Sequence, residues 1–115
     1  MQYLLLIHDA EKTWAAMPDA ERQKLFAEYN AFTASIKASG HFVAGQRLQS
    51  VTTATTVRIR DGKTQMTDGP FAETREQLGG FYMIEAKDLD EATKIAARIP
   101  SAKIGSIEVR PIMNM

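Results

Sequence analysis

The strongest fold signal in this sequence is the stretch QYLLLIHD at residues 2–9, which is apolar at nearly every position. A short apolar run of this kind is typical of a central β-strand. Its large side chains occupy both parities, and the same holds for GGFYMIEA at residues 79–86. Because successive side chains of a strand point to opposite faces of a sheet, both strands are expected to be apolar on two faces.

The elements around these two stretches follow from periodicity and turn residues. Apolar residues spaced by four, three and four positions share one face of a helix, which a following glycine ends. These residues are Leu25, Tyr29, Phe32 and Ile36, with Gly40 after them. Asp-Gly at residues 61–62, between two β-rich runs, is the strongest short hairpin signal. Helices are therefore expected over residues 18–39 and 88–99, and strands over residues 2–9, 41–48, 55–60, 63–68, 79–86 and 106–113.

Without the hairpin, this order is β-α-β-β-α-β, the split βαβ pattern of a ferredoxin-like antiparallel sheet in the α+β class. Both helices then cover the same face of the sheet. The opposite face would leave an apolar patch too large for a stable monomer, so we expect a second copy of the chain to cover it. Pro111 cannot donate to a strand ladder, which places the last strand at a sheet edge.

Composition excludes several classes of protein and of site. The chain has 115 residues, one domain spanning 1–115 by length, with 14 Lys+Arg against 14 Asp+Glu. A net charge of zero argues against a nucleic-acid binder and against attachment to anionic lipid. There are no cysteines and only two histidines, and no His-Glu-x-x-His spacing occurs, so neither a metal site nor a cofactor is expected. No membrane or targeting segment is visible, and we expect a cytoplasmic protein.

The segment before residues 79–86 carries a family resemblance. Residues 68–76 read DGPFAETRE and are followed by QLGGF. This segment resembles the signature of the DGPF branch of the YciI-related (YCII) family, and residues 3–7, 55–62 and 105–111 resemble the first strand, hairpin and terminal strand of that family. The resemblance implies a ferredoxin-like fold that pairs sheet to sheet as a dimeric α/β barrel.

The resemblance supplies no reaction. Some DGPF proteins are encoded beside sigma factors of the extracytoplasmic-function class, which implies a possible functional link to such a factor. The broader family has a suggested catalytic His and Asp pair, with its histidine in an Arg-x-x-His segment of the first helix. The comparable stretch of this sequence holds Glu28, Tyr29 and Phe32 and no histidine, so that pair cannot be carried over.

The candidate site residues each have a functional and a structural interpretation. His8, at the end of the first strand, and Asp68, at a Gly-Pro turn, would form a proton-transfer pair. The same residues also suit a packing histidine and a sharp turn. Arg110 suits a small anionic ligand through its planar fork, or a surface ion pair. Glu73 would add a second carboxylate or stay in solvent, and Tyr29 would edge a ligand pocket or belong to the core.

Two further residue features have simpler interpretations. His41, at a helix-to-strand turn, is expected in solvent. Gly79-Gly80 is expected to mark a β-bulge or a close backbone approach rather than a nucleotide-binding loop.

Two functions remain open from the sequence. One is a homodimeric module that binds a small ligand or a regulatory protein, which the missing helix histidine favours. The other is a cofactor-independent isomerase, lyase or hydrolase that uses proton transfer at His8 and Asp68 in a pocket between helices and sheet. The site hypothesis places His8, Asp68 and Arg110 around one polar pocket close to the dimer boundary. The alternative is that the three residues are separate and each is satisfied independently.

Overall fold

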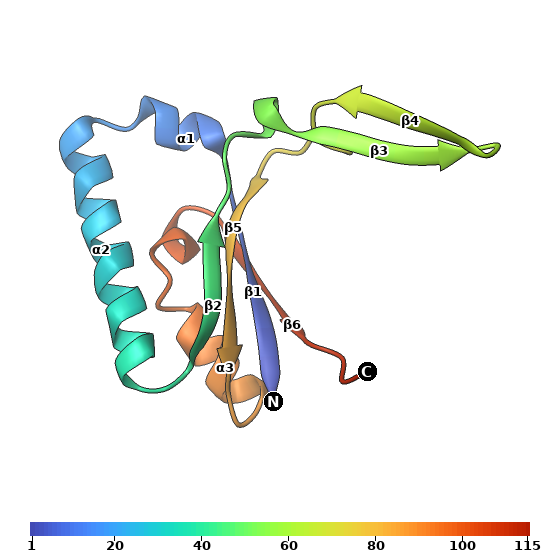
Figure 1. The fold of residues 1–115 in the computed structure, drawn as a ribbon. Helices are drawn as coiled ribbons and strands as arrows, with labels where there is room; N and C mark the ends of the chain where they lie inside the picture. The colour runs from blue at the N-terminus through green and yellow to red at the C-terminus, as the bar shows by residue number, and fades with distance from the viewer.

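A four-stranded antiparallel sheet forms the centre of the computed structural model, which describes residues 1–115 (Figure 1). Its strands are β1 (Gln2–Asp9), β2 (Phe42–Arg47), β5 (Gln77–Glu85) and β6 (Ser106–Pro111), in the order β2-β5-β1-β6. This is the strand order of the expected ferredoxin-like sheet, and it places β6 at an edge as Pro111 predicted. The predicted α+β class is confirmed.

Both long helices lie on one side of this sheet, as Figure 1 shows for α2 (Asp19–Ala38) and α3 (Leu89–Ala96). Odd positions of β1 point toward the helices and are buried, whereas even positions point away, and Leu4, Leu6 and His8 among them are half-buried. The buried apolar core joins strands and helices in one cluster, and Leu5, Ile36 and Ile84 are fully buried within it. The face that carries the even positions of β1 is called the helix-free face below.

The start and end of α2 follow from its terminal residues. The sequence predicted that the helix begins at Pro18. In the structure Pro18 is the N-cap, and the helix begins at the next residue, Asp19. At the other end, Gly40 has φ +80°, and the N–H groups of Gly40 and His41 donate to the carbonyls of Lys37 and Ile36. These two bonds form a Schellman motif, which satisfies carbonyls that a helix end leaves free.

Two other helical segments differ from expectation. A short helix, α1 (Glu11–Ala16), follows β1 and was not predicted. The helix expected over 88–99 ends at Ala96, and a 3₁₀ turn, η2 (Pro100–Lys103), follows it. Pro100 suits the first position of this turn because its missing N–H needs no partner there.

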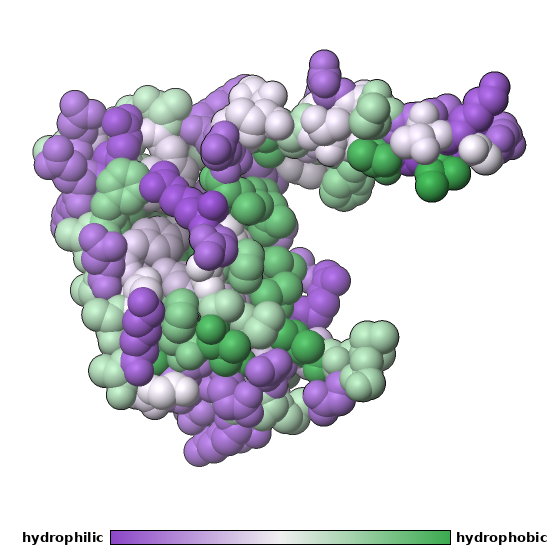
Figure 2. Space-filling model, in the orientation of Figure 1, coloured by the Kyte–Doolittle hydropathy of each residue, from purple (hydrophilic) through white to green (hydrophobic).

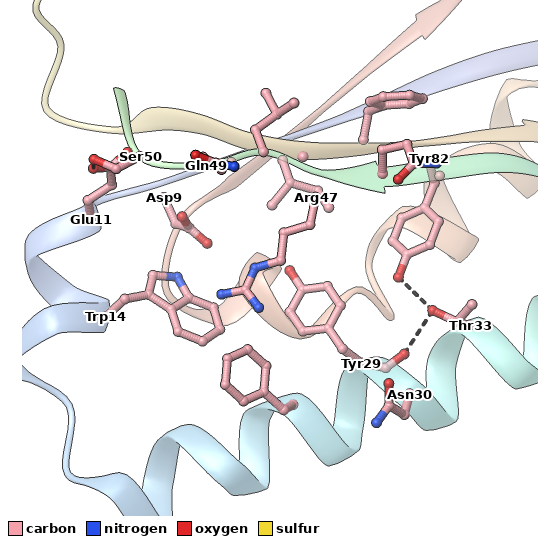
Figure 3. Close-up of a pocket in the computed structure, with 18 of the residues that line it drawn as sticks. Asp9, Glu11, Trp14, Tyr29, Asn30, Thr33, Arg47, Gln49, Ser50 and Tyr82 are labelled. Atoms are coloured by element: carbon pink, nitrogen blue, oxygen red, sulfur yellow. Dashed lines mark hydrogen bonds between the residues drawn. The ribbon is translucent and has the colours of Figure 1, made fainter. Parts of the chain in front are cut away.

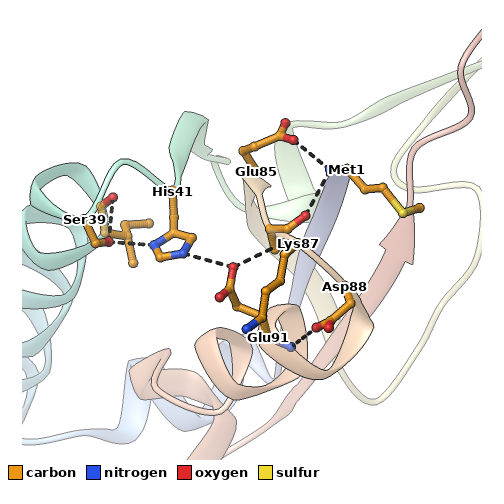
Figure 4. Close-up of polar contacts among 9 residues, drawn as sticks. Met1, Ser39, His41, Glu85, Lys87, Asp88 and Glu91 are labelled. Carbon is orange, nitrogen blue, oxygen red and sulfur yellow. Dashed lines mark hydrogen bonds and ion pairs between the residues drawn. The ribbon is translucent and has the colours of Figure 1, made fainter.

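A polar cluster joins the end of α2 to the start of α3 (Figure 4). His41 bonds Ser39 Oγ at 2.7 Å through Nδ1 and Glu91 Oε1 at 3.2 Å through Nε2. Asp88 caps α3 by accepting the Glu91 N–H, and Glu91 in turn accepts the N–H of Lys87. The expectation that His41 is in solvent is therefore wrong, because the returning strand places its ring between the two helices.

The predicted hairpin is present as a separate two-stranded sheet, β3 (Thr55–Arg60) and β4 (Lys63–Asp68). Asp61 and Gly62 both have positive φ, 54° and 73°, as the tight turn of such a hairpin requires. The hairpin projects from the body as an arm (Figure 1).

The arm enlarges the molecular surface. The accessible area is 8009 Å², against about 6,300 Å² for a compact monomer of this mass. The radius of gyration is 16.1 Å, against about 13 Å for a compact domain of this length. A single chain therefore carries much more surface than a closed monomer does. No helix of the chain combines the length and apolar character needed to cross a membrane.

Candidate functional site

A cavity of about 500 Å³ lies between the sheet and helices α1 and α2 (Figure 3). Its volume falls in the range of small-molecule sites, roughly 300–1,000 Å³. Its walls come from β1, β2 and β5 on one side and from the two helices on the other. The aromatic side chains that face the cavity are those of Trp14, Phe26, Tyr29, Phe42 and Tyr82.

Asp9 contributes a buried carboxylate to this cavity. Asp9 is 6% exposed, and its Oδ2 atom accepts a 2.8 Å hydrogen bond from the Ser101 hydroxyl. Ser101 is fully buried and in turn accepts a 2.5 Å hydrogen bond from the Tyr29 hydroxyl. A chain of two hydrogen bonds therefore runs from a helix tyrosine to a strand carboxylate.

The environment of Tyr29 keeps its hydroxyl protonated. Burial raises the pKa of Tyr29 to about 12, the hydrogen bond with Ser101 opposes this shift, and the negative charge of Asp9 adds to it. The phenol is thus a stable hydrogen-bond donor to Ser101 at neutral pH. The Ser101 hydroxyl can therefore use its own hydrogen to donate to Asp9.

Close backbone approach shapes the strand end that carries Asp9. The register of β1 against β5 shifts between Ile7 and His8, which confirms the predicted irregularity at Gly79-Gly80. A Cβ at Gly80 would stand 2.8 Å from the Gln46 carbonyl oxygen. Only glycine permits this packing, and the open backbone beside Asp9 becomes part of the cavity wall.

Two further charged residues line the cavity, Arg47 at the end of β2 and Glu11 at the start of α1. The Arg47 guanidinium carbon lies 4.6 Å from the Phe26 ring centroid and 5.7 Å from that of Trp14. The Glu11 carboxylate is already engaged, because it accepts hydrogen bonds from the Ser50 hydroxyl at 2.7 Å and the Val51 N–H at 3.0 Å.

A second polar cluster lies on the helix-free face and contains two predicted site residues. His8 Nε2 is 3.7 Å from Glu108 Oε1, and Arg110 pairs with the same carboxylate. The His8 Nε2 atom is buried and has no hydrogen bond within the chain. The structure thus brings His8 and Arg110 together through Glu108.

The other predicted site residues lie elsewhere. Asp68 and Glu73 are exposed, at the end of the arm and in the loop after it, and neither bonds His8 within one chain. Tyr29 does line the cavity, as one interpretation of its stripe allowed. The expectation that the pocket between helices and sheet contains His8 is wrong, because even positions of β1 point away from the helices.

Asp9, Ser101 and Arg47 are site residues that the sequence did not suggest. A signal for Asp9 was present: it shares the parity of the buried apolar residues Tyr3, Leu5 and Ile7. A carboxylate on the buried parity of a central strand is rare unless it has a partner. Ser101 gave no such signal, since its position depends on the turn after α3.

Comparison with known proteins places this geometry in context. The family model described as "YCII-related domain" matches residues 1–115. A protein of Rhizobium meliloti (strain 1021), named only as uncharacterised, is 37% identical over 114 residues, which cover 97% of this chain and 92% of that protein.

A solved structure shares the fold. It is 5-chloro-2-hydroxyhydroquinone dehydrochlorinase from Burkholderia phenoliruptrix AC1100, in complex with 2,5-dihydroxybenzoquinone. The TM-score is 0.58 at 17% sequence identity, and the match covers 100% of this chain and 96% of that one. This likeness concerns the fold alone.

Proposed function

The chain belongs to the YCII-related domain family, and we propose that it is a homodimeric module that binds a small molecule in the cavity beneath α2. The observation that carries this proposal is the buried carboxylate of Asp9 in the cavity wall. Burying an ionised carboxylate is costly unless hydrogen bonds or an opposite charge compensate it.

Within the chain, Asp9 is only partly compensated. Ser101 donates to Oδ2, and no protein group donates to Oδ1. Figure 3 shows the carboxylate directed toward the cavity. A ligand that carries a hydroxyl or amine would supply the missing donor, and the aromatic walls would bury its apolar part.

Blocking the cavity tests this function. Asn30 is exposed and lines the cavity, whereas its neighbour Ala31 is exposed and does not. We expect compounds that raise the melting temperature of the wild type in a metabolite screen to stabilise Ala31→Trp equally and to lose their effect on Asn30→Trp. Compounds that stabilise Asn30→Trp as well as the wild type would show that they bind elsewhere.

A cofactor-independent enzyme is the second candidate, and the Tyr29–Ser101–Asp9 chain favours it. Asp9 would act as general base toward a bound compound, with the protonated Tyr29 behind it. The fold neighbour is itself a dehydrochlorinase. Turnover of a bound compound that Asp9→Asn abolishes without loss of binding would establish an enzyme. Unchanged turnover in that variant would exclude Asp9 as the base.

The homodimer is supported by apolar surface that a single chain leaves open. Leu4, Leu6, Phe81 and Met83 lie half-buried on the helix-free face. Figure 2 shows apolar surface on the side of the body below the arm and on the underside of the arm. The exposed apolar residues of the arm itself are Val57, Ile59 and Met66. A second copy that packs sheet to sheet, as in a dimeric α/β barrel, would cover both surfaces.

Charge placed at the centre of this face tests the dimer. We expect Leu6→Lys to dissociate or unfold the dimer, because it buries a charge without a partner. Gln23→Lys, on the exposed side of α2, should leave the assembly intact. Light scattering measures the mass of each variant, and a stable wild-type monomer at micromolar concentration would refute the dimer.

Several finer statements remain predictions. The residues 68–71, DGPF, support a place in the DGPF branch. A proton-transfer pair of His8 and Asp68 would require the arm of one copy to reach the helix-free face of the other. The cytoplasmic location, the link to an extracytoplasmic-function sigma factor and the small anionic ligand at Arg110 also stay predictions.

A further inference from the structure

Arg47 brings an unpaired positive charge to the cavity. Figure 3 shows its side chain extending from β2 into the cavity, between Trp14 and Tyr29. Its guanidinium rests against two rings, 4.6 Å from the Phe26 centroid and 5.7 Å from the Trp14 centroid. No carboxylate oxygen lies within ion-pair distance of it, although Asp9 and Glu11 line the same cavity.

The two rings hold the guanidinium in place without using its hydrogen bonds. Stacking on an aromatic face fixes the plane of an arginine and leaves its N–H edge free. A planar fork of this kind suits two parallel hydrogen bonds to a carboxylate. The two acidic side chains that line the cavity, Asp9 and Glu11, do not serve this role, because neither forms an ion pair with Arg47.

Arg47 and Asp9 therefore offer complementary chemistry to one ligand. Asp9 provides an acceptor in the buried wall, and Arg47 provides a charged donor near the opening. The ring of Trp14 and the ring of Tyr29 stand beside the space that both groups face (Figure 3). Flat aromatic walls favour a flat ligand, since stacked rings bury the most surface.

We propose that Arg47 is an anion-binding residue of this cavity and that the ligand class is a small planar carboxylic acid with a hydroxyl group. The acid would bind the Arg47 fork and the hydroxyl would donate to Asp9. This inference rests on the proposed function of the cavity as a small-molecule site, and it adds the ligand class and the residue that selects it.

Calorimetric titration with three matched probes tests the assignment. The probes are 4-hydroxybenzoate, its neutral analogue 4-hydroxybenzamide, and benzoate, which lacks the hydroxyl. We expect the wild type to bind 4-hydroxybenzoate about tenfold or more tightly than either analogue, since a hydrogen bond to a charged group is at stake in each comparison. Arg47→Met should abolish the preference for the acid over the amide and keep the preference for the hydroxyl.

The controls separate charge from packing. Methionine retains an apolar stem against the rings, and Arg47→Gln gives the same comparison if methionine perturbs the fold. Arg75→Met removes an exposed arginine outside the cavity and should leave all three affinities unchanged.

The negative results are distinguishable. Equal wild-type affinity for the acid and the amide, or an unchanged preference in Arg47→Met, would overturn the role of Arg47. Absence of binding by all three probes at millimolar concentration would overturn the ligand class. Failure of the cavity as a binding site would appear instead in the earlier screen, as compounds that stabilise Asn30→Trp as well as the wild type.

Discussion

Removing the Ser101 hydroxyl should destabilise the protein far more than the loss of one atom suggests. Ser101 is fully buried and joins Tyr29 to Asp9 by hydrogen bonds of 2.5 and 2.8 Å. In Ser101→Ala, the Tyr29 hydroxyl loses its acceptor and the Asp9 carboxylate loses its only side-chain donor. In this variant the Asp9 carboxylate remains buried and the Tyr29 hydroxyl remains partly buried.

The expected magnitude follows from these two losses. A buried polar group left without its partner costs about 1–3 kcal/mol, and more when it is charged. We therefore expect the free energy of unfolding to fall by about 2–5 kcal/mol, which lowers the melting temperature by roughly 10–20 °C for a domain of this size. The matched control is Ser106→Ala, whose hydroxyl donates to Glu76 in an exposed setting. It should cost less than about 1 kcal/mol.

Urea unfolding at one fixed protein concentration measures these differences, because a dimer would make stability concentration-dependent. A double-mutant cycle with Tyr29→Phe then tests whether the three residues act as a unit. Tyr29→Phe removes the donor that Ser101→Ala strands, so the double variant should cost less than the sum of the single variants. Additive effects, or a Ser101→Ala variant as stable as Ser106→Ala, would refute the buried hydrogen-bond chain.

Three further predictions concern single positions. Because the pKa of Tyr29 is raised from 10.0 to about 12, the folded protein holds this proton after the unfolded chain releases it, so stability should fall as pH rises between about 10 and about 12. Tyr29→Phe should flatten this loss in unfolding titrations, and an identical pH profile would contradict the shift. Gly105→Ala would place a Cβ 2.2 Å from the His8 carbonyl oxygen, so urea unfolding should show a loss of about 1–3 kcal/mol; wild-type stability would contradict this contact. Gly69 has φ +100° with open space around it, so Gly69→Val should cost about 1–2 kcal/mol through backbone strain alone, and an unchanged melting temperature would contradict that reading.

Much of the fold could be predicted because it depends on local periodicity. The spacing of Leu25, Tyr29, Phe32 and Ile36 indicated one helix, and Asp61-Gly62 indicated the hairpin. Both signals lie within a few residues of the structure they specify. The short helix α1 has no clear signal in the sequence, because six residues give too little periodicity to indicate a helix.

The site was less predictable because it depends on contacts between distant segments. Asp9 and Ser101 are 92 positions apart and meet only after α3 packs on the sheet. His8 was a candidate because it is titratable, yet strand parity places it on the helix-free face and its neighbour Asp9 in the cavity. Arg47 shows the same limit, since the Trp14 and Phe26 rings that hold it come from two different helices.

The most direct test of ligand binding in the cavity uses Trp14, the only tryptophan of the chain. The measurement is a two-dimensional ¹H–¹⁵N spectrum recorded while a stabilising compound is added. A ligand in the cavity should shift the indole N–H of Trp14 together with the amides of Gly79 and Gly80, which line the same space. Shifts confined to Leu4 and Leu6 on the helix-free face, with the Trp14 indole unmoved, would contradict a binding site beneath α2.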